Sequence, residues 1–422
     1  MNKNKIMVLD TATANKIAAG EVVERPASIV KELIENSIDA QCNRIEIEIK
    51  NGGTTYIRVS DNGSGMSADD AKLAILRHAT SKIRKVEDLY SISSMGFRGE
   101  ALPSIAAVSR LSLVTRQEDT QLAVCIQTEG GELHKISEQG AEVGTTITVS
   151  DLFYNTPARK KFLKSINTES GQISLIIGKL ALAYNNVAFN LINNGRFTLS
   201  TSGSGNLLDA VAALYGIDTA DEMLVVNYEQ DGIKINGFVG KPAVLKSSRQ
   251  WQTLIVNGRI INNRAISRAI DDAYHSLLPK TGYPLAVLDI KILPEKIDIN
   301  VHPQKSEIKF DNEQIVFRAV YRAITLALSG ANRASDFAAP AKNAVNFEGI
   351  NTDNLPSKSV VSERITQYSP AMSQARQEVA DSWRKQEPLI PFNVVRELLE
   401  QQEPLKPNEQ GELHLNDAVA VE

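Results

Sequence analysis

The chain has 422 residues, 42% of them hydrophobic, and a formal net charge of −4, which gives enough apolar material for two or three packed domains. No apolar run approaches the ~20 residues that cross a membrane, and the N-terminus lacks the apolar core of a signal peptide, so we expect no membrane partner. Two cysteines are too few for a disulfide framework, which favours a cytoplasmic protein. The five histidines form no His-x-x-x-His pair, which disfavours a zinc enzyme.

The first informative element is a helix predicted over residues 27–40, directly after Pro26. Its apolar side chains share one stripe, while Glu32, Glu35, Asn36 and Asp39 lie at i, i+3, i+4 and i+7 and share the opposite stripe. Three carboxyls and one amide within two turns match the oxygen ligands of a hard divalent cation. A solvated acidic face is the alternative for this helix taken alone.

A hairpin is predicted over residues 44–60, because two strictly alternating stretches flank an Asn-Gly-Gly turn. The returning strand ends at Asp61, whose carboxylate could accept a hydrogen bond from the exocyclic amine of adenine. Gly63 and Gly65 would leave room for a flat base beside the backbone. Taken alone, this segment is better explained as an ordinary structural turn.

Two glycine-containing segments follow. Gly96 and Gly99 precede a helix predicted over residues 100–108, and backbone N–H groups at such a helix start favour phosphate, although an ordinary loop has the same pattern. Gly144 with Thr145 could place a hydroxyl near a base or a phosphate. The chain has neither a P-loop motif nor a Gly-x-Gly-x-x-Gly motif, which excludes a P-loop site and disfavours a dinucleotide fold.

The remaining elements predict two domains of the α+β class. Hairpins outnumber βαβ crossovers, so the first domain, residues 1–216, is predicted to be an α/β sandwich with a mainly antiparallel sheet. A second, smaller α/β domain is predicted over residues 217–333. Its strands are expected at about 222–228, 233–239, 251–256 and 285–292, and its closing helix at 314–329.

The last 89 residues differ in composition. They hold 7 of the 15 prolines, 8 basic and 14 acidic residues, which leaves 38 basic and 36 acidic residues in the rest of the chain. Such a segment buries too little apolar area to offset its ordering entropy, so residues 334–422 are predicted to be a disordered linker. The mildly basic body permits nucleic-acid binding without requiring it.

Four motifs follow one another along the chain: Glu32 with Asn36, then Asp61 with Gly63 and Gly65, then Gly96 with Gly99, then Gly144 with Thr145. In this order they resemble the Bergerat-type ATP-binding family, which includes gyrase B subunits, sensor histidine kinases, heat-shock ATPase chaperones and the mismatch-repair MutL branch. Longer stretches over about residues 8–333 resemble the MutL branch. They are residues 17–28, 78–82, 96–102, 152–162, 256–259 and 298–305.

The resemblance implies a Bergerat-type ATPase domain followed by a transducer-like domain, with ATP and Mg²⁺ as ligands. Glu32 would be the general base that orients the attacking water, and Lys305 would reach the γ-phosphate from the second domain. Asn36 would hold Mg²⁺, Asp61 would read adenine, and segments around Thr80 and Gly96 would form a lid. The implied nucleotide contacts are Asn36, Asp61, Gly63, Gly65, Thr80, Lys82, Gly96, Phe97, Arg98, Gly99, Glu100, Ala101, Leu102 and Thr145.

DNA contacts are expected at basic residues that would neutralise phosphates of double- or single-stranded DNA without reading sequence. A solvated surface is the alternative for each of them. These residues are Arg159, Lys160, Lys161, Lys164, Arg259 and Arg264, the last expected on a loop after a strand.

The function expected from the resemblance is a slow, Mg²⁺-dependent ATPase that acts as a nucleotide-gated switch in DNA mismatch repair. It would form a homodimer on binding ATP, with an arm of about residues 1–20 reaching across. Its partners would be a mismatch-recognition protein and a downstream nuclease or helicase, in the cytoplasm at the nucleoid. Alternatives are a type II topoisomerase-like ATPase subunit and a non-catalytic DNA-binding scaffold. The Asp-Gln-His-Ala…Glu nuclease motif of longer relatives does not occur here, so we expect no nuclease activity from these residues.

Overall fold

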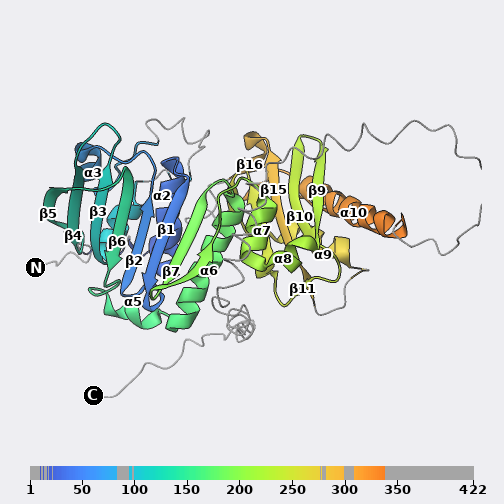
Figure 1. Cartoon of the computed structure of the whole chain (residues 1–422), viewed down its shortest axis with the longest axis horizontal. Helices are drawn as coiled ribbons and strands as arrows, with labels where there is room; N and C mark the ends of the chain where they lie inside the picture. Colours follow the sequence, from blue (N-terminus) through green and yellow to red (C-terminus); the bar gives the residue numbers. More distant parts are fainter. Residues whose placement is uncertain are drawn as a thin grey trace, which may run out of the picture. The chain divides into compact units, whose positions relative to one another are not determined.

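The computed structural model of the chain describes residues 10, 13, 17, 19–20, 22–82, 95–96, 99–275, 277, 282–298 and 308–337. These residues form an eight-stranded sheet and a five-stranded sheet, with helices packed on each (Figure 1). Among them, no helix combines the length and the hydropathy needed to cross a bilayer. The predicted linker lies outside the described residues, apart from the end of one helix.

The first sheet is mainly antiparallel, as predicted, and its single parallel pair joins β1 to β7. The predicted hairpin over residues 44–60 is confirmed as β1 and β2, joined by a turn at Asn51–Gly53. The strand order is β5 (Glu132–Gln139), β4 (Ala123–Glu129), β3 (Arg110–Arg116), β6 (Gly144–Ser150), β2 (Tyr56–Asp61), β1 (Arg44–Lys50), β7 (Ala188–Asn193) and β8 (Arg196–Ser200).

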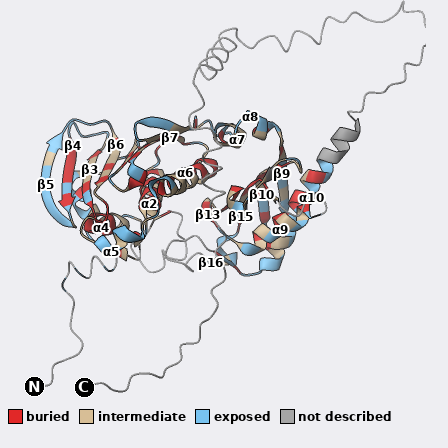
Figure 2. Cartoon of the chain, turned by 90° about the horizontal axis from the view of Figure 1, so that it is seen from below, coloured by how far each residue is buried: buried red, intermediate tan, exposed pale blue. Residues whose placement is uncertain are grey.

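Alternation along β1 separates the two faces of this sheet. Ile45, Ile47 and Ile49 are fully buried, and each contributes roughly 2 kcal/mol by leaving water. They face α2 (Pro26–Asp39) and α6 (Ile166–Ala183), which lie next to each other against this face (Figure 2). Shorter helices complete the domain: α3 (Ala68–Ala74), α4 (Ala101–Ala107) and α5 (Pro157–Phe162).

The second sheet carries helices on both faces. Its order is β13 (Arg259–Ile261), β12 (Gln252–Val256), β15 (Ala286–Ile292), β10 (Ile233–Gly240) and β9 (Met223–Gln230). On one face, α9 (Arg264–Tyr274) and α10 (Glu313–Phe337) pack around Tyr274 and Ile324; α10 is longer than the predicted helix over 314–329. On the other face, α7 (Leu207–Tyr215) and α8 (Ile217–Asp221) pack against Trp251 and Val287. Two short pairs, β11 (Leu245–Lys246) with β14 (Tyr283–Pro284) and β16 (Ile297–Asp298) with β17 (Lys309–Phe310), complete it.

The hydrophobic clusters beneath the two sheets are in contact. Ile260 of β13 packs on the cluster beneath the first sheet, and Leu182 of α6 belongs to a cluster beneath the second. The β12–β13 hairpin therefore lies against the helical layer that also holds the candidate site.

Candidate functional site

The carboxylate of Asp61 is held at the end of β2 by three other segments. Its Oδ2 accepts a hydrogen bond from Ser37 Oγ of α2 at 2.7 Å. Its Oδ1 accepts from the backbone N–H groups of Gly63 at 2.9 Å and Thr145 at 3.3 Å. Burial raises the pKa of the Asp61 carboxyl above its ordinary value, while these three hydrogen bonds favour the ionised form. The structure thus brings the sequence-predicted Asp61, Gly63 and Thr145 together around one fixed acceptor.

Two glycines near Asp61 are needed by the chain itself. Gly65 has φ +66°, and a Cβ there would lie 2.1 Å from the carbonyl oxygen of Arg116. Gly144 has φ +124°, and a Cβ there would lie 2.1 Å from the carbonyl oxygen of Asp61. Both positions combine a left-handed backbone with a close backbone approach, so glycine is required at each before any ligand is considered.

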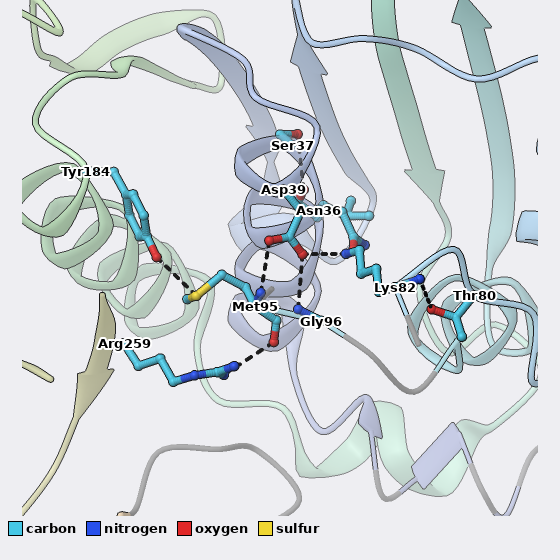
Figure 3. Close-up of polar contacts among 10 residues, drawn as sticks. Asn36, Ser37, Asp39, Thr80, Lys82, Met95, Gly96, Tyr184 and Arg259 are labelled. Carbon is cyan, nitrogen blue, oxygen red and sulfur yellow. Dashed lines mark hydrogen bonds and ion pairs between the residues drawn. The ribbon is translucent and has the colours of Figure 1, made fainter. Parts of the chain in front are cut away.

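The polar stripe of α2 meets Lys82 and Gly96, two residues predicted to belong to a lid (Figure 3). Asp39 accepts backbone hydrogen bonds from Met95 at 2.9 Å and Gly96 at 3.1 Å, and it pairs with the Lys82 ammonium. The same ammonium donates to Asn36 Oδ1 at 3.1 Å. A Cβ on Gly96 would lie 3.2 Å from Lys82 Nζ and 3.4 Å from Asn36 Oδ1. Asn36, Lys82 and Gly96, singled out in the sequence, therefore lie within contact of one another.

The other two carboxylates of the stripe have different surroundings. Glu35 is 4% exposed and pairs with the partly exposed Lys31 Nζ at 2.8 Å, so at this part of the stripe the carboxylate is buried and paired and does not form a solvated face. Burial lowers the pKa of Lys31, but the charges of Glu35 and Glu32 outweigh this effect and raise it. Glu32 keeps 23% of its side chain exposed and lies one turn before Asn36. Of the three carboxylates in this stripe, Glu32 is therefore the one exposed enough to contact a water molecule beside Asn36.

The donor set suits a magnesium ion bound mainly by phosphate and water. Asn36 Oδ1 and the Asp39 carboxylate already surround one cation, the Lys82 ammonium. Within the described ranges, no group of three or more His, Cys, Asp or Glu side chains is arranged to hold a metal. Mg²⁺ commonly takes one or two protein oxygens and completes its shell with phosphate oxygens and water, so the amide of Asn36 fits such a role.

Residues 78–82 and 99–102 form adjoining segments. The backbone N–H of His78 donates to Gly99 O at 3.2 Å, and His78 Nδ1 lies 3.7 Å from a Glu100 oxygen. The Thr80 hydroxyl accepts from the Lys82 backbone N–H at 3.2 Å. The helix predicted over residues 100–108 is present as α4, Ala101–Ala107, one residue shorter at each end, and it includes Leu102. Phe97, Arg98 and Lys305 were also predicted to contact nucleotide and lie outside the described residues.

The basic residues predicted to bind DNA fall into different environments. Lys160, Lys161 and Lys164 are exposed on or just after α5. Arg159 is partly buried, and its guanidinium fills the space above Gly20, where a Cβ would lie 1.6 Å from Nη2.

The other two predicted arginines belong to the second sheet domain. Arg264 is exposed, but the expectation that it lies on a loop is wrong, because it is the first residue of α9 and follows the N-cap Asn263. Arg259 is only 5% exposed, and its Nη1 donates to Met95 O at 3.4 Å. Arg259 therefore lies against Met95 and does not extend into solvent.

A cavity of about 410 Å³ opens on the sheet face opposite α2, and Asp61, Gly144 and Thr145 of the candidate site form part of its wall. Its polar walls include Arg44, Arg58 and Asn190. Arg58 already pairs with Glu46, and with Glu48 at 3.5 Å, so its charge is neutralised. The outer wall of the cavity thus lacks an unpaired charge from Arg58, and the convergent donors and acceptors on the α2 side, around Asp61 and Asn36, mark the better candidate for the site.

Sequence reasoning missed three members of this constellation. Ser37 orients Asp61, Met95 presents its backbone to Asp39 and Arg259, and Tyr184 contacts Met95. Ser37 could have been found from its position between Asn36 and Asp39 on the same helix. Met95 and Tyr184 are ordinary apolar and aromatic residues in the sequence, and only the fold places them together.

Two family models match the chain. Residues 24–156 match the histidine kinase-, DNA gyrase B- and HSP90-like ATPase family, and residues 211–329 match the C-terminal domain of DNA mismatch repair protein. The DNA mismatch repair protein MutL of Desulforamulus reducens is 47% identical over 326 residues, which span 77% of this chain and 51% of that protein. The chain belongs to the MutL family of DNA mismatch-repair proteins. MutL of Symbiobacterium thermophilum is similarly close, at 48% identity over 78% of the chain and 52% of that protein.

Solved structures give the same result for the fold. The Aquifex aeolicus MutL ATPase domain complexed with ADP is 27% identical, with a TM-score of 0.51 over 71% of this chain and 98% of that one. The N-terminal domain of a DNA repair protein has a TM-score of 0.65 at 25% identity, over 76% of this chain and 99% of that one. The chain therefore carries the ATPase domain of MutL proteins and the domain that follows it. It spans about half the length of the curated MutL relatives that it matches.

Proposed function

We propose that the chain binds ATP with Mg²⁺, hydrolyses it slowly, and acts as a nucleotide-gated switch in DNA mismatch repair. One observation carries this proposal: α2 joins both halves of the candidate site. Ser37 fixes Asp61 on one side of the helix, and Asn36 and Asp39 meet Lys82 and Gly96 on the other. A nucleotide bound across α2 would meet a base acceptor at one end and a cationic, oxygen-rich region at the other.

The base would be read by Asp61. Oδ1 is occupied by two backbone N–H donors, whereas Oδ2 has one donor, Ser37 Oγ, and keeps a lone pair for the exocyclic amine of adenine. Thr145 supports this arrangement through its N–H and through a 2.9 Å hydroxyl contact with Thr115. An acceptor held in this way favours adenine over guanine, which presents an oxygen at the same position.

The phosphates would lie over the lid side of α2. Mg²⁺, held through Asn36 Oδ1, would neutralise charge on the phosphate oxygens. Glu32, one turn earlier, would accept the proton of the attacking water as its oxygen bonds to the γ-phosphorus and the bond to the β-phosphate oxygen breaks. Lys82 would donate to phosphate, and we propose the same for Phe97 and Arg98 through the lid backbone and for Lys305 through its ammonium. The lid glycines Gly96 and Gly99, with Glu100, Ala101 and Leu102, would close around them.

Gel filtration tests nucleotide binding and gating together. We expect the chain to elute as a monomer alone and as a dimer with Mg²⁺ and a non-hydrolysable ATP analogue, because closure of the lid would create a surface for a second copy. The same run with analogue and EDTA is the control and should give the monomer. An unchanged elution volume with bound analogue would remove dimerisation from the proposal.

DNA binding is proposed for the exposed lysines Lys160, Lys161 and Lys164, with Arg264. Because such residues contact phosphate, log K against log [salt] should fall steeply, and a Lys160→Ala/Lys161→Ala variant should reduce the slope by about 2 for duplex DNA. Fluorescence anisotropy with two unrelated duplexes measures this slope. Replacing Lys72, which is exposed on α3 and pairs with Asp69, is the matched control. A salt-independent affinity would contradict phosphate binding.

The cellular role would follow from these steps. ATP binding would change the chain's affinity for DNA and for a mismatch-recognition protein, and hydrolysis would reset it before a nuclease or helicase acts. We place this role in the cytoplasm, at the nucleoid.

A further inference from the structure

Among the described residues of the proposed nucleotide lid, Met95 contacts the second sheet domain. Tyr184, at the C-terminal end of α6, donates its hydroxyl proton to Gly258 O at 2.7 Å, and the same oxygen lies 3.0 Å from Met95 Sδ. Arg259, the next residue after Gly258, donates to Met95 O at 3.4 Å. These contacts join the β12–β13 hairpin to the lid segment (Figure 3).

Two members of this cluster are buried, and Tyr184 is partly buried. Met95 is 7% exposed and Arg259 5%. Burial raises the pKa of Tyr184 to about 12, with the charge of Glu35 adding to the rise and Arg259 opposing it, so the hydroxyl remains a proton donor at neutral pH. Glu35 itself pairs with Lys31 on α2. A donor that loses its acceptor beside these buried groups is left poorly satisfied, which costs free energy.

The opposite side of the same segment contacts the site. The Met95 and Gly96 N–H groups both donate to Asp39, which also pairs with Lys82. Gly96 has so little space beside Lys82 and Asn36 that a single added Cβ would contact both. A movement of Met95 of about an ångström would therefore change the position of the groups proposed to hold phosphate.

We propose that Tyr184 and Arg259 are positioning residues that hold Met95, and through it the Gly96 amide and Asp39, so that the β12–β13 hairpin sets the conformation of the phosphate lid. This inference rests on the proposed ATPase function and assigns a regulatory path to its site. It also gives Arg259 a role other than the DNA contact expected from its charge.

Hydrogen exchange of the Met95 and Gly96 amides tests the contacts in the 422-residue chain without nucleotide. We expect Tyr184→Phe and Arg259→Lys each to speed exchange at these two amides by about tenfold, with exchange in β1 and α2 unchanged. Tyr274→Phe is the matched control, because Tyr274 is also buried and donates to a glycine carbonyl, Gly240 O, within the second sheet domain. It should leave both amides unchanged.

Steady-state kinetics then separates positioning from a general loss of structure. A displaced lid should raise the KM for ATP by about tenfold in Tyr184→Phe, whereas loss of folded molecules lowers kcat and leaves KM unaltered. Unchanged exchange at Met95 and Gly96 in both variants, or an equal effect of Tyr274→Phe, would overturn the inference. Absence of hydrolysis in the wild-type chain would instead refute the proposed function, and the exchange experiment would still decide whether these contacts hold the segment.

Discussion

The Glu32→Gln variant should bind ATP as the wild-type chain does and hydrolyse it about 10²- to 10⁴-fold more slowly. Glutamine keeps the size of the side chain and its place one turn before Asn36, but its amide cannot accept the proton of the attacking water. Within the described residues, Glu32 forms an ion pair of 3.9 Å with the partly exposed Lys31, so its loss should cost little stability. Single-turnover phosphate release measures hydrolysis, and a fluorescent ATP analogue measures binding.

Glu46→Gln is the matched control for this result. Glu46 lies on the outward face of β1, pairs with Arg58, and loses the same charge without approaching α2's polar stripe. It should leave turnover unchanged. Unaltered hydrolysis in Glu32→Gln would show that another group activates the water, and loss of binding without a change in the chemical step would place Glu32 in the nucleotide pocket only.

Local periodicity predicted the elements that lie around the site. The run Arg44–Lys50 alternates because one face of β1 is buried, and α2 has an apolar stripe because it covers that face. Strand β5 was missed because seven of its eight residues are exposed, which leaves no apolar alternation to detect. Strand β7 pairs in parallel with β1 from about 140 residues away, and a short sequence window carries no record of that pairing.

The site was predictable only where one element carries several of its members. Asn36 and Glu32 share a helix face, so their proximity follows from helical geometry. The hydrogen bond between Ser37 and Asp61, in contrast, depends on how α2 packs on the sheet. Arg259 shows the same limit: a positive charge in a hairpin suggested a surface contact, but packing of that hairpin on the helical layer buried its side chain.

The Asp61→Asn variant should lose about ten- to a hundredfold in ATP affinity, the equivalent of ~1–3 kcal/mol for an unsatisfied polar contact. The two N–H donors from Gly63 and Thr145 fix the asparagine oxygen at the Oδ1 position, so its NH₂ group must replace Oδ2 beside Ser37 Oγ, which can accept from it. The adenine amine would then face a second donor. GTP, which presents an acceptor there, should lose less affinity or gain some. Competition titrations with both nucleotides measure the change in preference.

The melting temperature of the Asp61→Asn variant distinguishes a lost contact with adenine from misfolding. Burial raises the folded-state pKa of Asp61, so the wild-type chain is most stabilised by this group at low pH and loses that contribution as pH rises through the raised pKa. Asparagine has no such loss, so the variant should melt at or above the wild-type temperature at neutral pH, with the difference shrinking as pH falls. Asp151→Asn, which removes a carboxylate paired with Arg110 just after β6, should leave nucleotide preference unchanged. An Asp61→Asn chain that melts normally and still prefers ATP over GTP would mean that adenine is bound elsewhere.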